Sequence, residues 1–413
     1  MKGKWMFTLM LTVGLGFGFS QAWAQFPKNP TWTTVFVPPA PIEGLTGDND
    51  GNFYVADRGS GGVDCAVWQI DTNTNMVQQV GLITGDCGPS GLAFDTNGDL
   101  FITSAAGIYK LTPTVGVPPE AIAALPSITG VPGNNGVAFD EHGDLYISDG
   151  TNNQGIVWKV TDLPANCSTN DNCVELFRVP PRRNGIDLGG MVATEDQEDG
   201  VGSVRFTAPR FDVCFPTPAD DDADCLSAQN DKQDIVANGL AFNRRGDLYV
   251  ADTSRGAIWK VEFDSNGNIK NNQTGCDKTF ALNTLCWDNL WIADPRLEGI
   301  DGIALDLLGN IWASVNERNA IVVVTSLLKR VTEIFQNPPD GTTLLRNGNG
   351  DTDPVVGRPM EFPTSPFLSG RKFCTSGADS PRRDNNPNGP GEGSKVTCMV
   401  ENLTIPGLPL PVQ

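Results

Sequence analysis

The chain has 413 residues, of which 49 are acidic and 29 are basic, so its formal net charge is −20. A surface this acidic repels nucleic acid and anionic membranes, which excludes both as partners. The single histidine, His142, stands in the sequence Asp140-Glu141-His142-Gly143-Asp144 and is expected in an exposed turn. Ser-His-Asp triads, histidine-rich zinc sites and c-type haem attachment are therefore excluded as well.

Residues 1–24 are predicted to be an export signal peptide. Lys2 and Lys4 precede an apolar run, and Ala22-Trp23-Ala24 offers a small-residue cleavage site. A transmembrane anchor is the alternative, but the apolar run from Trp5 to Phe19 is short for a bilayer span. The mature protein, residues 25–413, is therefore expected to be secreted or periplasmic.

One phrase recurs along the mature chain. It consists of Gly, an aliphatic residue, a small residue, an apolar residue, usually Asp, a turn ending in Gly-Asp or Gly-Asn, and an apolar pair. The phrase begins at Gly44, Gly91, Gly136, Gly239 and Gly302. Two short apolar runs joined by a tight glycine turn predict a β-hairpin. A third strand is expected after each hairpin, at 67–70, 108–111, 157–160, 258–261 and 321–324, and a fourth after that, for example at 175–179 and 331–335.

Four strands per unit, at a spacing of roughly 45 residues, are typical of β-propeller blades. A sixth, degenerate unit is expected from Phe362 onward, with 395–400 as its third strand and 31–37 as its outer strand. The long interval between the third and fourth phrases contains either a seventh blade around 185–210 or an insertion. Because it lacks the phrase, an insertion from about 162 to 234 is favoured. The prediction is an all-β, six-bladed propeller that forms one domain.

The ten cysteines fall as close neighbours along the chain. They form the couples Cys65/Cys87, Cys167/Cys173, Cys214/Cys225, Cys276/Cys286 and Cys374/Cys398. Consecutive pairing is expected because each couple brackets a single turn or loop, although spacing alone does not determine connectivity. No C-x-x-C motif is present, so disulfides are favoured over a metal-thiolate site, in agreement with export.

The residue at the start of each first strand, just before the repeated glycine, is polar. In chain order these residues are Glu43, Ser90, Asn135, Asn238 and Asp301, with Thr364 as the approximate sixth. Because the first strand of each blade lines the channel, these side chains are expected to form a ring at one mouth. Carboxylate and amide oxygens are ligands that a hard cation such as Ca²⁺ prefers. A purely structural ring is the alternative, since Asn and Asp also bond their own backbone at strand starts.

The repeats resemble the senescence marker protein, gluconolactonase and luciferin-regenerating enzyme family. The order Glu, Asn, Asn, Asp on first strands, the late Phe-Pro-Thr-Ser-Pro and the closing Pro-Gly-Leu-Pro-Leu-Pro carry this resemblance. It implies a six-bladed propeller that uses a divalent metal, often Ca²⁺ but alternatively Zn²⁺, Mn²⁺ or Mg²⁺, to hydrolyse lactones or related esters. It also implies Glu43, Asn238 and Asp301 as metal ligands, Asp301 as catalytic general base, and Asn135 as a contact of substrate or of a metal-bound water.

One position departs from the family. Its sugar lactonases carry an arginine two residues before the asparagine that corresponds to Asn135, and Gly133 stands there in this chain. The expectation is a secreted, calcium-dependent hydrolase of a small-molecule lactone or ester, whose particular substrate is left open. The alternative is a non-catalytic binding or scaffolding propeller with a structural metal ion, since a fold does not assign a function. The oligomeric state is left open.

Overall fold

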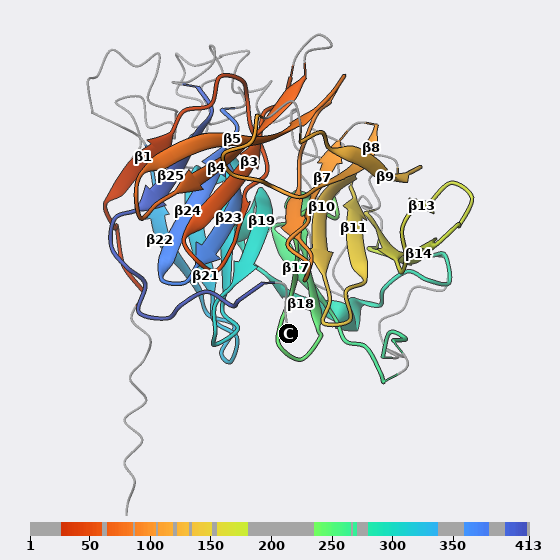
Figure 1. Cartoon of the computed structure of the whole chain (residues 1–413). Coiled ribbons are helices and arrows are strands. Elements are labelled where there is room, and N and C mark those ends of the chain that lie inside the picture. Colours follow the sequence, from red (N-terminus) through yellow and green to blue (C-terminus); the bar gives the residue numbers. More distant parts are fainter. Residues whose placement is uncertain are drawn as a thin grey trace, which may run out of the picture.

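Six antiparallel sheets surround one axis in the computed structural model of this chain (Figure 1). The structure describes residues 26–59, 64–85, 87–104, 106–118, 122–131, 134–150, 155–180, 235–265, 267–270, 280–337, 359–379 and 393–410. The expected signal peptide, residues 1–24, lies outside these ranges. No helix in the described ranges is long and apolar enough to cross a bilayer.

The first three blades follow the chain in order, each starting with a strand at the channel. Blade 1 contains β2 (Thr46–Gly47), β3 (Asn52–Ala56), β4 (Cys65–Asp71) and β5 (Met76–Ile83). Blade 2 contains β6 (Leu92–Phe94), β7 (Leu100–Ser104), β8 (Gly107–Leu111) and β9 (Leu125–Thr129). Blade 3 contains β10 (Asn134–Phe139), β11 (Leu145–Asp149), β12 (Ile156–Val160) and β14 (Cys173–Arg178).

The remaining blades repeat this plan, and the last one also uses a strand from the start of the chain. Blade 4 contains β15 (Leu240–Phe242), β16 (Leu248–Asp252), β17 (Ala257–Val261) and β18 (Leu290–Ala293). Blade 5 contains β19 (Ile300–Leu305), β20 (Ile311–Val315), β21 (Ala320–Val324) and β22 (Val331–Gln336). Blade 6 contains β23 (Pro363–Ser369), β24 (Lys372–Gly377), β25 (Lys395–Met399) and β1 (Trp32–Phe36). The prediction of a six-bladed all-β propeller is confirmed.

The ring closes through β1, which pairs antiparallel with β25 and places Trp32 opposite Met399. In Figure 1 the red strand β1 accordingly lies beside the blue strand β25. A strand from each end of the chain thus shares one sheet, as expected from the sequence. This closure covers the edge that an open blade 6 would expose to other chains.

Each repeated hairpin turn is held by its own first side chain. In blade 2, Asp95 Oδ1 accepts hydrogen bonds from the main-chain N–H groups of Asn97 and Asp99, both at 2.9 Å. Gly98 adopts a φ of +83°, a left-handed conformation that favours glycine. The same turn recurs at 140–144, 243–247 and 306–310. His142 lies in one of these turns with its side chain 75 % exposed, as its sequence context predicts.

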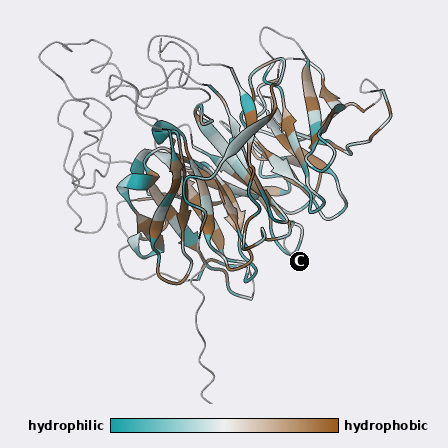
Figure 2. Cartoon of the chain, turned by 90° about the vertical axis from the view of Figure 1, so that its left-hand side faces the viewer, coloured by the Kyte–Doolittle hydropathy of each residue, from teal (hydrophilic) through white to brown (hydrophobic). Residues whose placement is uncertain are grey.

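Aromatic side chains join neighbouring blades. Edge-to-face pairs link blades 1 and 2, 2 and 3, 3 and 4, and 6 and 1. They are Tyr54–Phe94, Phe101–Phe139, Tyr146–Phe242 and Phe53–Phe367, with ring centroids between 4.8 and 6.0 Å apart. In Figure 2 the strands carry much of the hydrophobic colour and the turns at the blade ends much of the hydrophilic colour. The core is therefore a set of apolar layers between the blades.

Three disulfides lie in the described ranges, and all three join consecutive cysteines as expected. They are Cys65–Cys87, Cys167–Cys173 and Cys374–Cys398. Cys286 is also disulfide-bonded. Its expected partner Cys276 and the couple Cys214/Cys225 lie outside the described residues.

The beginning of the expected insertion at 162–234 is blade structure. Strand β14 is the outer strand of blade 3, and β13 (Ala165–Asn166) adds a parallel fifth strand to blade 2 beside β9. The Cys167–Cys173 bridge closes the loop between these two strands. Residues 181–234 lie outside the described ranges, so the described part of the expected insertion belongs to blades 2 and 3.

Candidate active site at the channel mouth

Close backbone contacts between neighbouring blades determine where the residues of the polar ring lie. The glycine that opens each phrase lies against the main-chain carbonyl of the ring residue in the next blade. A Cβ added at Gly239 would stand 2.6 Å from the carbonyl oxygen of Asp301, closer than side chains pack. Equivalent approaches join Gly44 to Ser90, Gly91 to Asn135, Gly136 to Asn238 and Gly302 to Thr364. The repeated glycine therefore permits close blade contact and sets the six ring residues in sequence around one mouth.

Second-strand hydroxyl groups hold the same carbonyls. Thr103 donates to the carbonyl oxygen of Asn135 at 3.1 Å, and Ser148 donates to that of Asn238 at 2.6 Å. Ser376 donates to the carbonyl oxygen of Glu43 at 2.5 Å, from the last blade to the first. The backbone at these ring positions is thus tied to the neighbouring blade, which restricts where each side chain can point.

A second polar ring supports the first. In blades 1, 4 and 5, the residue 15 positions after the ring residue contacts it directly. Thr253 Oγ1 accepts a hydrogen bond from Asn238 Nδ2 at 3.0 Å, and Asn316 Nδ2 donates to Asp301 Oδ2 at 2.9 Å. Arg58 Nη1 donates to Glu43 Oε2 in blade 1. Repeat geometry therefore gives each of the three expected metal ligands a partner from its own blade.

The charge of Glu43 and the side chain of Asn238 both act on the carboxyl of Asp301. Asp301 is buried, and burial raises the pKa of its carboxyl well above the usual range. The nearby charge of Glu43 raises this pKa further. Hydrogen bonds from Asn316 and Asn238, together with the charge of Arg58, act in the opposite direction. A carboxylate in such a poorly solvated place is favoured either by a positive charge beside it or by protonation.

The donor set fits a hard divalent cation. Two carboxylates and the amide oxygen of Asn238 are the oxygen ligands that Ca²⁺ accepts, and the remaining positions would suit water or substrate. Within the described ranges, no three His, Cys, Asp or Glu side chains gather at one point, so the amide is needed to complete such a set. Asn238 is 2 % exposed, which a polar side chain tolerates when its atoms have partners.

Asn135 lies one blade before Asn238, in β10, and its side chain is half-buried. The position 15 residues further on is Gly150, which offers no side chain to engage it. Ser90 precedes β6 and is also half-buried. Among the described residues, Glu43, Asn238 and Asp301 are thus supported by a side chain 15 positions further on, whereas Asn135 is not.

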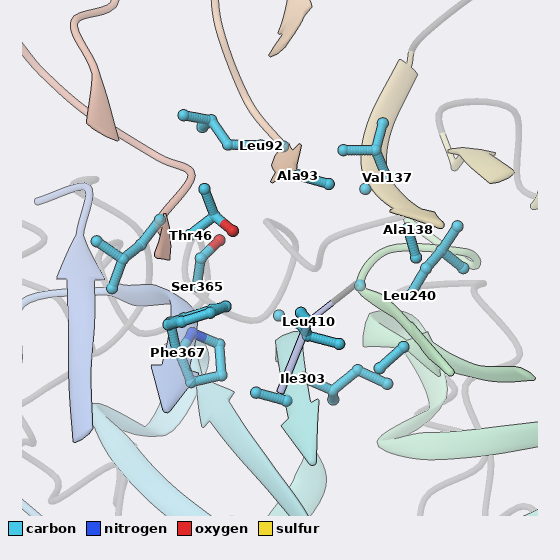
Figure 3. Close-up of a pocket in the computed structure, with 18 of the residues that line it drawn as sticks. Thr46, Leu92, Ala93, Val137, Ala138, Leu240, Ile303, Ser365, Phe367 and Leu410 are labelled. Carbon is cyan, nitrogen blue, oxygen red and sulfur yellow. The ribbon is translucent and has the colours of Figure 1, made fainter. Parts of the chain in front are cut away.

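Residues 408–410 lie at the opposite end of the channel. The inner strands of all six blades line a mainly apolar channel with a cavity of about 100 Å³, and Leu410 lies among them (Figure 3). The main-chain N–H of Leu408 donates to the carbonyl of Leu305 at 2.9 Å. Asn49 Nδ2 donates to the carbonyl of Leu410 at 3.5 Å.

Arg58, Thr253 and Asn316 are functional-site residues that were not predicted from the sequence. Their signal is positional: each stands 15 residues after a ring residue, directly after the second strand or one residue beyond it. Aligning the repeats on their opening glycines brings these three positions into one column. That column would have predicted a supporting ring.

Fold and mouth together define a six-bladed β-propeller with a ring of polar residues at one mouth of its channel. Residues 220–372 match the family described as SMP-30/Gluconolactonase/LRE-like region, which confirms the resemblance seen in the sequence. No protein with a curated functional description matches the chain.

Solved structures share the fold. A calcium-binding protein, regucalcin, from Agrobacterium tumefaciens str. C58 is 12 % identical over 93 % of this chain and 97 % of its own, with a TM-score of 0.51. A luciferin-regenerating enzyme is 12 % identical over 92 % of this chain and 97 % of its own, also with a TM-score of 0.51. At this identity the similarity establishes the propeller architecture.

Proposed function

We propose that this protein is an exported, divalent-metal-dependent hydrolase of a small-molecule lactone or ester, with Ca²⁺ as its metal. The observation that supports the proposal is that the charge of Glu43 and the amide of Asn238 both act on the buried carboxyl of Asp301. The partial family match and the disulfides are compatible with such an enzyme outside the cytosol.

In the proposed mechanism, Glu43, Asn238 and Asp301 would hold the cation. A bound divalent cation supplies Lewis-acid polarisation of the substrate carbonyl. Asp301 acts as the general base, taking a proton from the attacking water at a carboxylate oxygen. Asn316, which donates to Asp301 Oδ2, fixes the orientation of that carboxylate. Asn135 contacts the substrate through its amide.

Two measurements test this function. Protein purified in the presence of CaCl₂ and then dialysed should retain a divalent ion by elemental analysis, and its melting temperature should rise with added calcium. On a panel of lactones and small esters, Asp301→Asn should lower kcat/KM by about 10²-fold or more while the fold is retained. Asp95→Asn is the matched control, because the equivalent turn in blade 4 already begins with Asn243.

The outcomes separate the candidates. Unchanged turnover in Asp301→Asn would remove Asp301 from its role as base. Bound calcium without hydrolysis of any panel member would favour the binding or scaffolding propeller with a structural ion. Absence of both calcium binding and hydrolysis would contradict the proposed metal centre.

A further inference from the structure

Arg58 is the charged member of the supporting ring. Its counterparts Thr253 and Asn316 are neutral, and each can stay hydrogen-bonded to its ring residue when a cation is present. Arg58 instead places a permanent positive charge against Glu43, one of the proposed ligands. The guanidinium group has only donors and remains protonated in proteins.

The Arg58 backbone is anchored while its side chain reaches the mouth. Its main-chain N–H donates to the carbonyl of Pro41 at 2.5 Å. Its side chain is 44 % exposed, whereas that of Glu43 is 16 % exposed. The charge of Arg58 also lowers the pKa of Asp301, so it acts on both proposed carboxylate ligands.

A divalent cation and this guanidinium group require the same oxygen atoms. Glu43 Oε2 accepts from Arg58 in the structure, and two positive groups near one carboxylate repel each other. The pair is partly solvated and therefore weak enough to exchange. Cation binding would thus displace Arg58 from Glu43. The bound cation would then supply the positive charge beside this carboxylate.

We propose that Arg58 is an internal competitor for the divalent cation, which pairs with Glu43 in the cation-free protein and weakens cation binding at the mouth. This inference rests on the metal centre of the proposed function. Arg58 is a positioning residue here, since it acts through Glu43. Its effect is to shift filling of the site to higher calcium concentrations.

Calcium titration of the EDTA-stripped protein by calorimetry tests the inference. Arg58→Gln should lower the Kd for calcium at least tenfold, whereas Arg58→Lys, which keeps the charge, should leave it within about threefold of wild type. Arg296→Gln is the matched control. Arg296 pairs with Asp294 at side-chain exposures of 46 % and 18 %, close to those of the Arg58–Glu43 pair. The Kd of the Arg296→Gln variant for calcium should equal that of wild type.

Thermal unfolding provides a second readout that does not depend on activity. In EDTA, Arg58→Gln should melt below wild type, because the two carboxylates lose their counter-charge. With saturating calcium its rise in melting temperature should exceed that of wild type. Combining Arg58→Gln with Glu43→Gln should abolish this difference, since the two residues act as a pair. Arg58→Met serves as the second variant if Arg58→Gln does not fold.

The calcium titrations distinguish an error in this inference from an error in the proposed metal centre. If wild type binds calcium and Arg58→Gln binds it equally or more weakly, Arg58 is not a competitor, and the metal centre stands. If neither protein binds calcium at millimolar concentrations, the metal centre and the competition are both overturned.

Discussion

The hydroxyl group of Thr364 donates a hydrogen bond to the main-chain carbonyl of Glu43, 321 residues earlier in the chain. Thr364 belongs to blade 6 and Glu43 precedes the first strand of blade 1, so this bond lies where the propeller closes. Ser376 donates to the same carbonyl at 2.5 Å. The position of one proposed metal ligand therefore depends on ring closure as well as on its own blade.

Replacing the Thr364 hydroxyl should loosen this closure. Thr364→Val keeps the side-chain shape and leaves the Glu43 carbonyl with Ser376 as its remaining side-chain donor, at an expected cost of about 1–2 kcal/mol in the free energy of unfolding. Urea denaturation measures the change. Thr114→Val, at an exposed hydroxyl, is the control and should cost less than about 0.5 kcal/mol. Equal effects of the two substitutions would contradict a role of this bond in closure.

The repeated glycines should tolerate no side chain. A Cβ at Gly302 would stand 2.6 Å from the Thr364 carbonyl oxygen, and backbone there cannot easily move, so Gly302→Ala should cost about 3 kcal/mol. Gly143→Ala provides the comparison. Gly143 has a φ of +85° with nothing within 4 Å of an added Cβ, so backbone strain alone should cost about 1 kcal/mol. Chemical denaturation that ranked Gly143→Ala as the more damaging change would refute the close-contact explanation.

The chain end should contribute to stability through apolar burial. Leu408 is 5 % exposed and packs in the core cluster shared by blades 3, 4 and 5. Leu408→Ala should therefore lower the free energy of unfolding by about 2–4 kcal/mol. Leu282→Ala, at a fully exposed leucine, should change it by less than about 0.5 kcal/mol. A Leu408→Ala melting curve that overlays wild type would show that burial of Leu408 contributes nothing to stability.

Asp57 should make stability depend on pH. Burial raises the pKa of its carboxyl to about 6, against a hydrogen bond from Trp68 that lowers it. A raised carboxyl pKa favours folding below the unfolded-state pKa of about 4, and this contribution is lost as pH rises through 6. Asp57→Asn should thus be more stable than wild type at pH 8, by about 2–3 kcal/mol at most, with little difference at pH 3.

Melting temperatures of wild type and Asp57→Asn between pH 3 and 8 measure this effect. Asp162→Asn, at an exposed position, is the control and should follow the wild-type profile. A constant difference between Asp57→Asn and wild type at every pH would argue against titration of Asp57 in this range.

Replacing Asn135 should lower catalytic efficiency without changing the affinity for calcium. If the proposed function holds, Asn135→Ala should lower kcat/KM by roughly ten- to a hundredfold, the loss of one hydrogen bond to substrate, with the Kd for calcium unchanged. Asn97→Ala, in an exposed turn, is the control. A parallel loss of calcium affinity in Asn135→Ala would assign Asn135 to the metal shell instead.

Much of this protein was predictable because its order is local and repeated. The phrase from Gly91, for example, contains both hairpin strands and the Asp95 turn that joins them, and the turn is held by bonds within five residues. Repetition then places Glu43, Asn238 and Asp301 at equivalent positions of their blades. The six blades, the closing strand and three cysteine pairings followed from such patterns.

Contacts between segments that are distant in the sequence could not be predicted from such local patterns. The bond from Thr364 to the Glu43 carbonyl, the seating of Leu410 in the channel and the addition of β13 to blade 2 depend on which segments become neighbours in the closed ring. Local hydrogen bonding and hydrophobic periodicity act over a few residues, so they specify each blade. Electrostatic pairing and channel packing act across space, and they arise when the closed ring brings residues hundreds of positions apart to one axis.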